Sequence, residues 1–241
     1  LPLNCWSEHC PWAVKVNREP TQDKTDTGLL RSSALVGFFT MLSRFAGLAR
    51  DIVFARVIGA EALADVFFVA FKIPNFFRRL FAEGAFAQAF VPILAEYREQ
   101  GSRAAVRELV SRVSGTLGLT LFLVTLFVLF CAPFFAAIFA PKWYASDPQK
   151  FIATTEMLRI TFPYLFFISM TGLAGAVLNS YDRFAVPAFT PLLLNLSLIT
   201  AALLGAPYFQ QPAYALAWGV FAAGVVQFIF QLPFLRSIHM L

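Results

Sequence analysis

Charged residues and histidines are scarce in this chain, and their scarcity excludes several classes of protein. Only 14% of the 241 residues are charged, and residues 113–141 and 184–235 contain no charge at all. The two histidines, His9 and His239, lie near the two ends of the chain. The sequence has no paired-carboxylate motif, glycine-rich phosphate loop or cluster of metal ligands. An enzyme is therefore not predicted, and no cofactor or metal ion is expected.

Cysteine is also rare, and the three cysteines do not form a disulfide framework. Cys5 and Cys10 lie in the N-terminal segment, whereas Cys131 lies within an uncharged run. The sequence CWSEHC at 5–10 places two cysteines near a histidine, but no second pair of ligands follows. A metal site there is the less favoured interpretation.

The first 28 residues differ from the rest of the chain. They are polar and lack the apolar core that a signal peptide requires. We expect residues 1–28 to be a disordered cytosolic tail, or an artefact of where translation was assumed to begin. The chain starts with leucine rather than methionine, which favours a fragment or a mis-set start.

Apolar residues make up 59% of the chain, far more than in a soluble domain. A helix needs about 20 apolar residues to span a bilayer, so 113–141 can hold one span and 184–235 two. The predicted fold class is an all-α integral membrane protein. Six membrane helices are expected within 29–241: about 33–58, 66–94, 104–139 and 148–179, then one ending near residue 204 and one ending near 235. Ser146 or Asp147 is expected to cap the fourth helix, with Pro148 at its first position.

Basic residues in the short connections predict the orientation of these helices. The connection at 95–112 is rich in arginine, whereas the turn at 205–212 has no basic residue. Both ends of the six-helix unit are therefore expected in the cytoplasm, in a multi-pass membrane protein. Four aromatic residues then lie at the outer interface: Trp143, Tyr144, Tyr208 and Tyr214. The net charge of +5 forms no exposed basic patch, so nucleic acid is not an expected partner.

Unusually for membrane spans, the first two predicted helices contain several charges. In SRFAGLARD (43–51), helical spacing places Arg44, Gly47 and Asp51 on one stripe, with Ser43, Gly47 and Arg50 on the stripe beside it. The second helix repeats this pattern with a polar stripe of Asp65, Lys72, Asn75, Arg79 and Glu83, with Arg78 at its edge.

Pro74 lies within the second predicted helix and removes a backbone donor. A helix break is predicted there. In a membrane, such a break persists where it is buried in protein or lines a wet cavity.

The charges within these two helices do not balance. Arg44, Arg50, Lys72, Arg78 and Arg79 are five positive charges against the three negative charges of Asp51, Asp65 and Glu83, which leaves two unpaired. Buried unpaired charge is strongly disfavoured, and an anionic ligand would resolve it, since arginine suits phosphate oxygens. A cationic cavity for an anion is therefore predicted. The alternative is that these side chains are ion-paired or reach the interface, as Arg56 and Lys72 can.

The motifs SRFAGLARD and DVFFVAFKIPNFFRRLFAEGAFAQAFVPILAEY resemble the MurJ (MviN) family of lipid II flippases, within the superfamily of multidrug, oligosaccharidyl-lipid and polysaccharide exporters. The stretches LRITFPYLFFISMTGLAGAVLNSYDRFAVPAFTPLLLN and ALAWGV are also similar to that family. The resemblance covers about residues 29–241.

The resemblance implies a fold of fourteen helices in two lobes around a central cationic cavity. Residues 29–241 would be the N-terminal lobe, in a chain truncated at its C-terminus. The implied activity is transport of undecaprenyl-diphosphate-linked peptidoglycan precursor from the inner to the outer leaflet of the bacterial inner membrane by alternating access. The implied partners are this glycolipid, membrane lipids and the missing C-terminal lobe.

The resemblance also assigns roles to residues of this chain. The family's substrate-binding arginines correspond to Arg44, Arg50 and Arg78. Its acidic residue early in the second helix corresponds to Asp65, and its gate glutamate to Glu83. Two alternatives stay open, namely an exporter of another lipid-linked glycan and a scaffold membrane protein of cell-wall synthesis.

Overall fold

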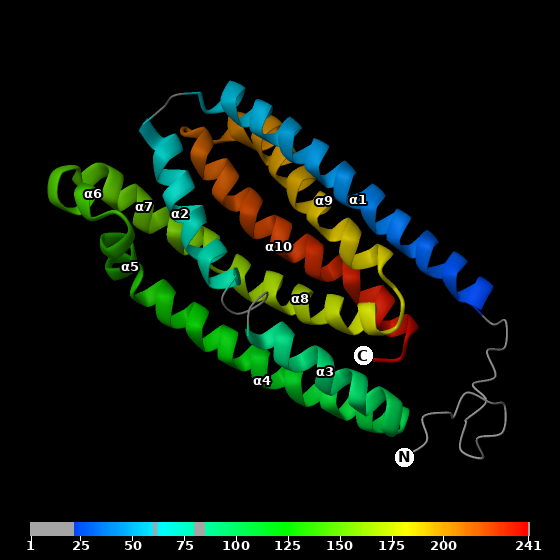
Figure 1. The fold of residues 1–241 in the computed structure, drawn as a ribbon. Helices are drawn as coiled ribbons and strands as arrows, with labels where there is room; N and C mark the ends of the chain where they lie inside the picture. The colour runs from blue at the N-terminus through cyan, green and yellow to red at the C-terminus, as the bar shows by residue number, and fades with distance from the viewer. Residues whose placement is uncertain (1–21, 60–61, 80–84, 241) are drawn as a thin grey trace, which may run out of the picture.

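The computed structural model describes residues 22–59, 62–79 and 85–240, which form helices with no strand among them. Figure 1 shows a bundle of long helices that run in alternating directions. The helices are α1 (Gln22–Val57), α2 (Ala62–Arg78), α3 (Ala85–Gln100), α4 (Arg103–Phe130), α5 (Ala132–Phe139), α6 (Pro141–Ser146), α7 (Pro148–Thr161), α8 (Tyr164–Ser180), α9 (Ala185–Thr200), the π-helix η2 (Ala201–Gly205), the 3-10 helix η3 (Ala206–Tyr208) and α10 (Pro212–Ser237).

Four stretches of the described chain are long and apolar enough to cross a membrane: Arg103–Phe130, Pro148–Ser180, Ala185–Tyr208 and Pro212–Ser237. They coincide with the last four predicted spans. The first two predicted spans correspond to α1 and to α2 with α3. Both contain charged residues, and α2 has only 17 residues.

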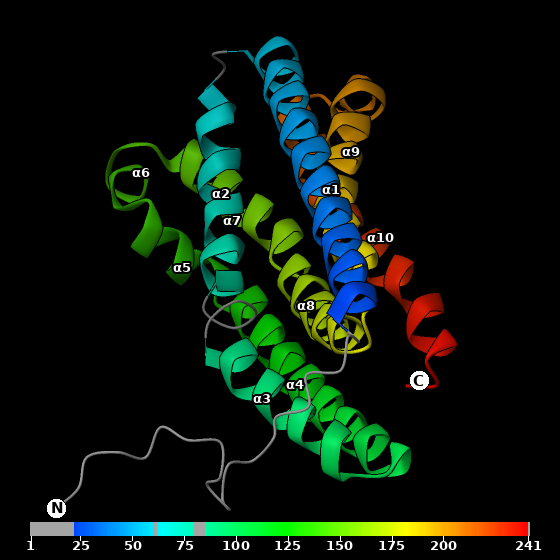
Figure 2. The same cartoon turned by 45° about the vertical axis from the view of Figure 1, so that its right-hand side comes forward.

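Helix α10 lies near the centre of the bundle. It packs against α8 and α9, while α1 packs along α9 and α2 along α7. Helices α3 and α4 run side by side beyond the end of α2, and α3 also contacts α8 (Figures 1 and 2). Helix α8 therefore joins the two sides of the bundle.

Glycines allow α10 to approach its neighbours closely. A Cβ atom added at Gly219 would lie 2.5 Å from the Cβ of Ala201 in η2. One added at Gly224 would lie 2.8 Å from a ring carbon of Tyr164 in α8. Small residues at membrane-helix contacts let backbones pack against each other, since lipid provides no hydrophobic drive for association.

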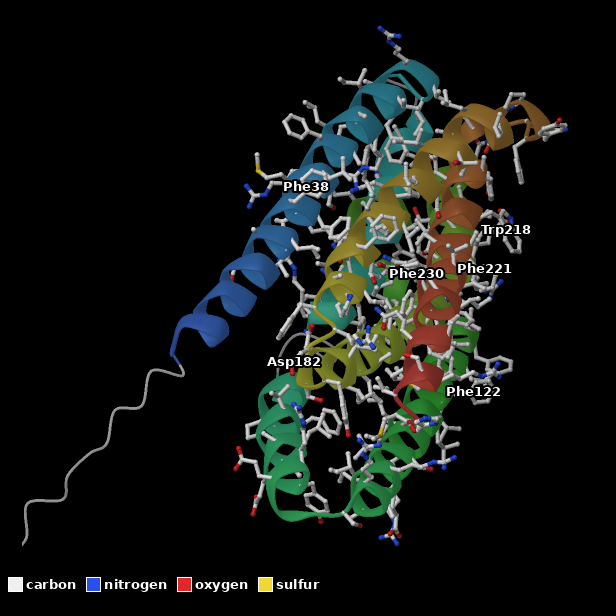
Figure 3. The ribbon with its side chains drawn as sticks, turned by 90° about the vertical axis from the view of Figure 1, so that its right-hand side faces the viewer. Phe38, Phe122, Asp182, Trp218, Phe221 and Phe230 are labelled. Atoms are coloured by element: carbon white, nitrogen blue, oxygen red, sulfur yellow. The ribbon has the colours of Figure 1, made fainter. Side chains whose placement is uncertain are left out.

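Large apolar side chains cover the outside of the bundle. Phe38, Phe122 and Trp218 point away from the helix contacts in Figure 3 and are 64%, 56% and 49% exposed. An exposed apolar surface of this kind suits a lipid environment, where every backbone polar group must be satisfied within the protein.

The start of α1 corrects the predicted boundary of the N-terminal segment. The helix begins at Gln22 rather than near residue 33, so residues 22–28 are helical and not part of a disordered tail. No proline lies between residues 22 and 57, and extending a helix costs less than starting one. Residues 1–21, which include the CWSEHC sequence, lie outside the described residues.

The helix break predicted at Pro74 is wrong. Helix α2 continues through Pro74 to Arg78, and α3 begins at Ala85. Pro74 has no N–H to donate to the carbonyl of Ala70, one turn earlier. The hydroxyl of Thr161, on α7, donates to that carbonyl at 3.2 Å, and Thr161 is fully buried. A side chain of the neighbouring helix thus replaces the missing backbone bond, and α2 continues.

This replacement predicts that Thr161 matters only because Pro74 is present. Thr161→Val is expected to destabilise the purified protein by about 1–3 kcal/mol, because the carbonyl of Ala70 is left buried and unpaired. In a Pro74→Ala background, the new N–H can bond to Ala70, so the same substitution should cost much less. Thermal unfolding of the four variants in detergent measures this coupling.

Thr154→Val is the matched control. Thr154 is equally buried on α7, but its hydroxyl donates at 2.7 Å to Lys150 of its own helix. Thr154→Val should therefore lower the stability by the same amount whether position 74 is proline or alanine. An equal cost of Thr161→Val in both backgrounds would contradict the replacement of the bond.

Two other predicted helices are also divided. The one expected at 104–139 splits at Cys131 into α4 and α5, because Pro133 cannot donate within the first helix. The one expected at 148–179 turns at Phe162 and Pro163 between α7 and α8. The cap of α7 is Asp147 rather than Ser146, and it accepts from the N–H of Lys150 at 3.1 Å.

Candidate substrate-binding cavity

A cavity of about 1150 Å³ opens between α1, α2, α8, α9 and α10. Its size suits a ligand larger than a typical small molecule. Polar side chains from all five helices line it, and they are separated by apolar ones such as Phe71 and Ile168. The polar lining residues are Arg50, Asn75, Arg78, Tyr164, Thr171, Asn179, Ser180, Thr190, Gln227 and Gln231.

Arg50 reaches the cavity from α1 and is held by three neighbours. Its Nε and Nη2 donate to Oδ1 of Asp51 at 3.0 and 2.7 Å, and its Nη1 donates to Oδ1 of Asn195 at 3.0 Å. The guanidinium carbon lies 5.8 Å from the centre of the Phe54 ring. Asn195 also donates from Nδ2 to the backbone carbonyl of Ser43 at 3.0 Å. The guanidinium plane is therefore oriented by both α1 and α9.

Arg78 lines the cavity from α2, near the end of that helix. Its Nε donates to Oδ1 of Asn75, one turn earlier, at 2.9 Å, and the side chain is half-buried. Asn75 and Arg78 both line the cavity. The continuation of α2 through Pro74 places this pair at the cavity wall.

The cavity wall is cationic. Two guanidinium groups line it, and no carboxylate is among the lining residues in the described part of the chain. Asp51, which pairs with Arg50, is itself 64% exposed and does not line the cavity. Arginine keeps its charge at any ordinary pH and offers planar donors that match phosphate oxygens. The geometry therefore suits an anion with several oxygen acceptors.

The structure brings only some of the predicted residues to the cavity. Arg44, Asp65, Lys72 and Arg79 are exposed, and none of these four described residues lines it. Ser43 contributes through its backbone carbonyl, as described above. Glu83 lies outside the described residues.

The sequence analysis missed the polar residues of α9 and α10. Asn195, Thr190, Gln227 and Gln231 all lie in the uncharged run 184–235 and are at most 7% exposed. A signal was available, because buried amides are costly in an apolar span and the two glutamines are four residues apart. Charged residues alone do not reveal these uncharged amides.

Comparison with known proteins identifies the family. The family model described as "Lipid II flippase MurJ" matches residues 54–241. The chain belongs to the MurJ family. The resemblance seen in its motifs is thus confirmed.

Relatives in the MurJ family are similar over most of this chain. The "Probable lipid II flippase MurJ" of Haemophilus influenzae is 48% identical over 208 residues, which cover 84% of this chain and 41% of the relative. The "Lipid II flippase MurJ" of Burkholderia cenocepacia is 47% identical over 212 residues, 88% of this chain and 41% of that protein. The chain thus spans about two fifths of the length of the curated relatives that it matches.

A solved structure shares the fold. The structure titled "Lipid II flippase MurJ, inward closed conformation" matches with a TM-score of 0.69 and 27% identity. The match covers 85% of this chain and 42% of that one. The all-α membrane fold predicted from the sequence is confirmed, and its helices correspond to part of a MurJ structure.

Proposed function

We propose that the protein containing this chain translocates lipid II from the inner to the outer leaflet of the bacterial inner membrane. It acts as a transporter rather than an enzyme, and its cavity holds the anionic diphosphate of the head group. The observation that supports this most directly is the cavity itself. It has Arg50 and Arg78 on two of its walls and no carboxylate among its described lining residues.

Both arginines are oriented by hydrogen bonds in this mechanism. Arg50 is held in place by Asp51 and Asn195, so it presents an oriented positive charge. Arg78 is oriented by Asn75, and its planar guanidinium suits phosphate oxygens. Binding by preorganised charges costs little reorganisation when the head group arrives.

Residues outside the described cavity have supporting roles in the proposal. Arg44 lies six residues before Arg50 on α1, about 9 Å along the helix axis. We propose that Arg44 contacts the head group from the exposed side of α1, while Asp65, Lys72, Arg79 and Glu83 support the cavity and its gate. A second, C-terminal lobe would complete the site, since alternating access needs two bodies that move around it.

Complementation tests the proposed function. The full-length gene is expected to restore growth and outer-leaflet lipid II in a strain depleted of its own lipid II flippase. A well-expressed protein that fails to restore either would contradict the proposal.

We also propose that both ends of the bundle face the cytoplasm. A single cysteine at Ser146, after the chain's own cysteines are replaced, should react with an impermeant maleimide added to intact cells. Ser146 is exposed at the end of α6. A single cysteine at Glu99, exposed at the other end of the bundle, should react only after the cells are opened.

Glu99 is a better site for the cysteine than Gly101 in the adjacent turn. A Cβ atom at Gly101 would lie 2.5 Å from the carbonyl oxygen of Tyr97, so a cysteine there would distort the turn. Labelling of Glu99→Cys but not Ser146→Cys in intact cells would reverse the proposed orientation.

A further inference from the structure

A cluster of three buried polar residues, Thr190 of α9 with Gln227 and Gln231 of α10, forms one wall of the cavity. Both glutamines are only 1% exposed and Thr190 is 5% exposed. Burying amides between membrane helices is unfavourable unless their groups find partners. We call these residues the glutamine cluster.

The hydrogen bonds of the glutamine cluster determine how both amides are oriented. The hydroxyl of Thr190 donates to the carbonyl of Val186 at 3.0 Å, so its oxygen is left to accept. Nε2 of Gln231 donates to that oxygen at 2.9 Å. Nε2 of Gln227 donates to the backbone carbonyl of Thr190, also at 2.9 Å, and a carbonyl can only accept. Reversing the Gln227 amide would place two acceptors against each other, and reversing that of Gln231 would require the Thr190 hydroxyl to give up its bond to Val186.

Each glutamine therefore turns its other atom, Oε1, away from Thr190. Both Oε1 atoms are buried and have no hydrogen-bond partner among the described residues. Buried polar atoms are nearly always paired, so an unpaired one in a cavity wall calls for a physical explanation. Here the two Oε1 atoms, on adjacent turns of α10, are both buried without a partner among the described residues.

We propose that the glutamine cluster is a recognition site for the sugar of the transported glycolipid. The two Oε1 atoms accept hydrogen bonds from hydroxyl or acetamido N–H groups of the sugar next to the diphosphate. This inference rests on the proposed function and adds a second, uncharged subsite to the cationic one.

The spacing of the two subsites suits one head group. Thr190 and Asn195, the partner of Arg50, are five residues apart on α9, about 7.5 Å along its axis. A sugar attached directly to a diphosphate lies within that reach. Arginines hold the diphosphate and cannot accept a hydrogen bond, whereas the glutamine acceptors match the donors of the sugar.

The binding preference of the full-length protein tests the glutamine cluster. Native mass spectrometry in detergent would compare lipid II with undecaprenyl diphosphate, which has no sugar. Wild-type protein should prefer lipid II. The double variant Gln227→Met/Gln231→Met should lose about tenfold in affinity for lipid II and little for undecaprenyl diphosphate. Each single variant keeps one acceptor and should lose about threefold in affinity for lipid II. The single variants provide the test if the double variant does not fold.

Thr125→Val is the matched control. Thr125 of α4 is also buried with an unpaired hydroxyl oxygen, but it does not line the cavity. Its removal should leave the preference unchanged. A third probe, which carries the sugar but no peptide, should be preferred over undecaprenyl diphosphate as lipid II is. A preference only for the peptide-bearing lipid would overturn the assignment to the sugar.

The outcomes separate this inference from the proposed function. An unchanged preference in the Gln227→Met/Gln231→Met variant overturns the glutamine cluster as a sugar site and leaves the flippase proposal standing. Binding of neither lipid by wild-type protein, or binding of both that is unaffected by Arg78→Ala, overturns the two together.

Discussion

Replacing Arg78 with alanine is expected to reduce lipid II flipping by about a hundredfold or more, with little change in the amount of protein in the membrane. Arg78 lines the cationic cavity and is oriented by Asn75. Removing a charge that pairs with a desolvated phosphate commonly costs several kcal/mol. Its half-buried position means that the loss is mainly of ligand contact and not of packing. The assay is lipid II accessibility at the outer leaflet, read beside a blot for protein level.

Two further substitutions sharpen this prediction. Arg78→Lys should impair flipping only part-way, because lysine keeps the charge but lacks the planar fork. Arg50→Ala should act like Arg78→Ala, since Arg50 lines the same cavity. Arg44→Ala should also impair flipping if Arg44 contacts the head group from the exposed side of α1.

Arg103 provides the matched control. It is exposed at the start of α4, outside the cavity, and its replacement by alanine should be nearly neutral. Arg98 is a poorer control, because it pairs with Asp182 at 3.8 Å and lies over the ring of Tyr181. Normal flipping by an Arg44→Ala/Arg50→Ala/Arg78→Ala variant would show that these arginines serve insertion or folding.

Gly219→Ala is expected to lower the stability of the bundle by about 1–3 kcal/mol. The added methyl group would lie 2.5 Å from Cβ of Ala201, and neither atom can move without its backbone. Helix α10 and η2 would therefore have to separate at the point where they pack most closely. The melting temperature of the purified protein in detergent measures the effect.

Restoring the space should restore the stability. Ala201→Gly removes the methyl group that the new side chain would meet, so the double variant should melt closer to the wild type. Gly115→Ala is the control, since a Cβ there meets nothing within 4 Å and improves helix propensity. A double variant no more stable than Gly219→Ala alone would contradict the steric explanation.

Some features of this protein could be predicted from local sequence alone. Apolar runs as long as 184–235 indicate membrane helices wherever they occur, because the length of a span depends on the bilayer. The polar stripe of Ser43, Gly47 and Arg50 followed from helical periodicity, which needs no knowledge of neighbouring helices. The motifs around residues 43–51 and 65–97 were sufficient to indicate the family.

The placement of these residues depended on contacts between distant parts of the chain. Helical spacing put Arg44 and Arg50 on adjacent stripes, but only the packing of α1 on α9 separates the exposed Arg44 from Arg50 at the cavity. Asn195, which orients Arg50, is 145 residues away in sequence. No local pattern could connect them.

Whether α2 breaks at Pro74 was likewise decided by tertiary structure. Proline removes a donor from any helix, and from sequence this predicts a break. Whether the helix breaks depends on what reaches the freed carbonyl of Ala70, and Thr161 lies 91 residues further along the chain. Local sequence therefore determined the membrane class, the helices and their polar faces. The packing of α7 on α2 and of α9 and α10 around the cavity decided which polar groups are paired and which line the cavity.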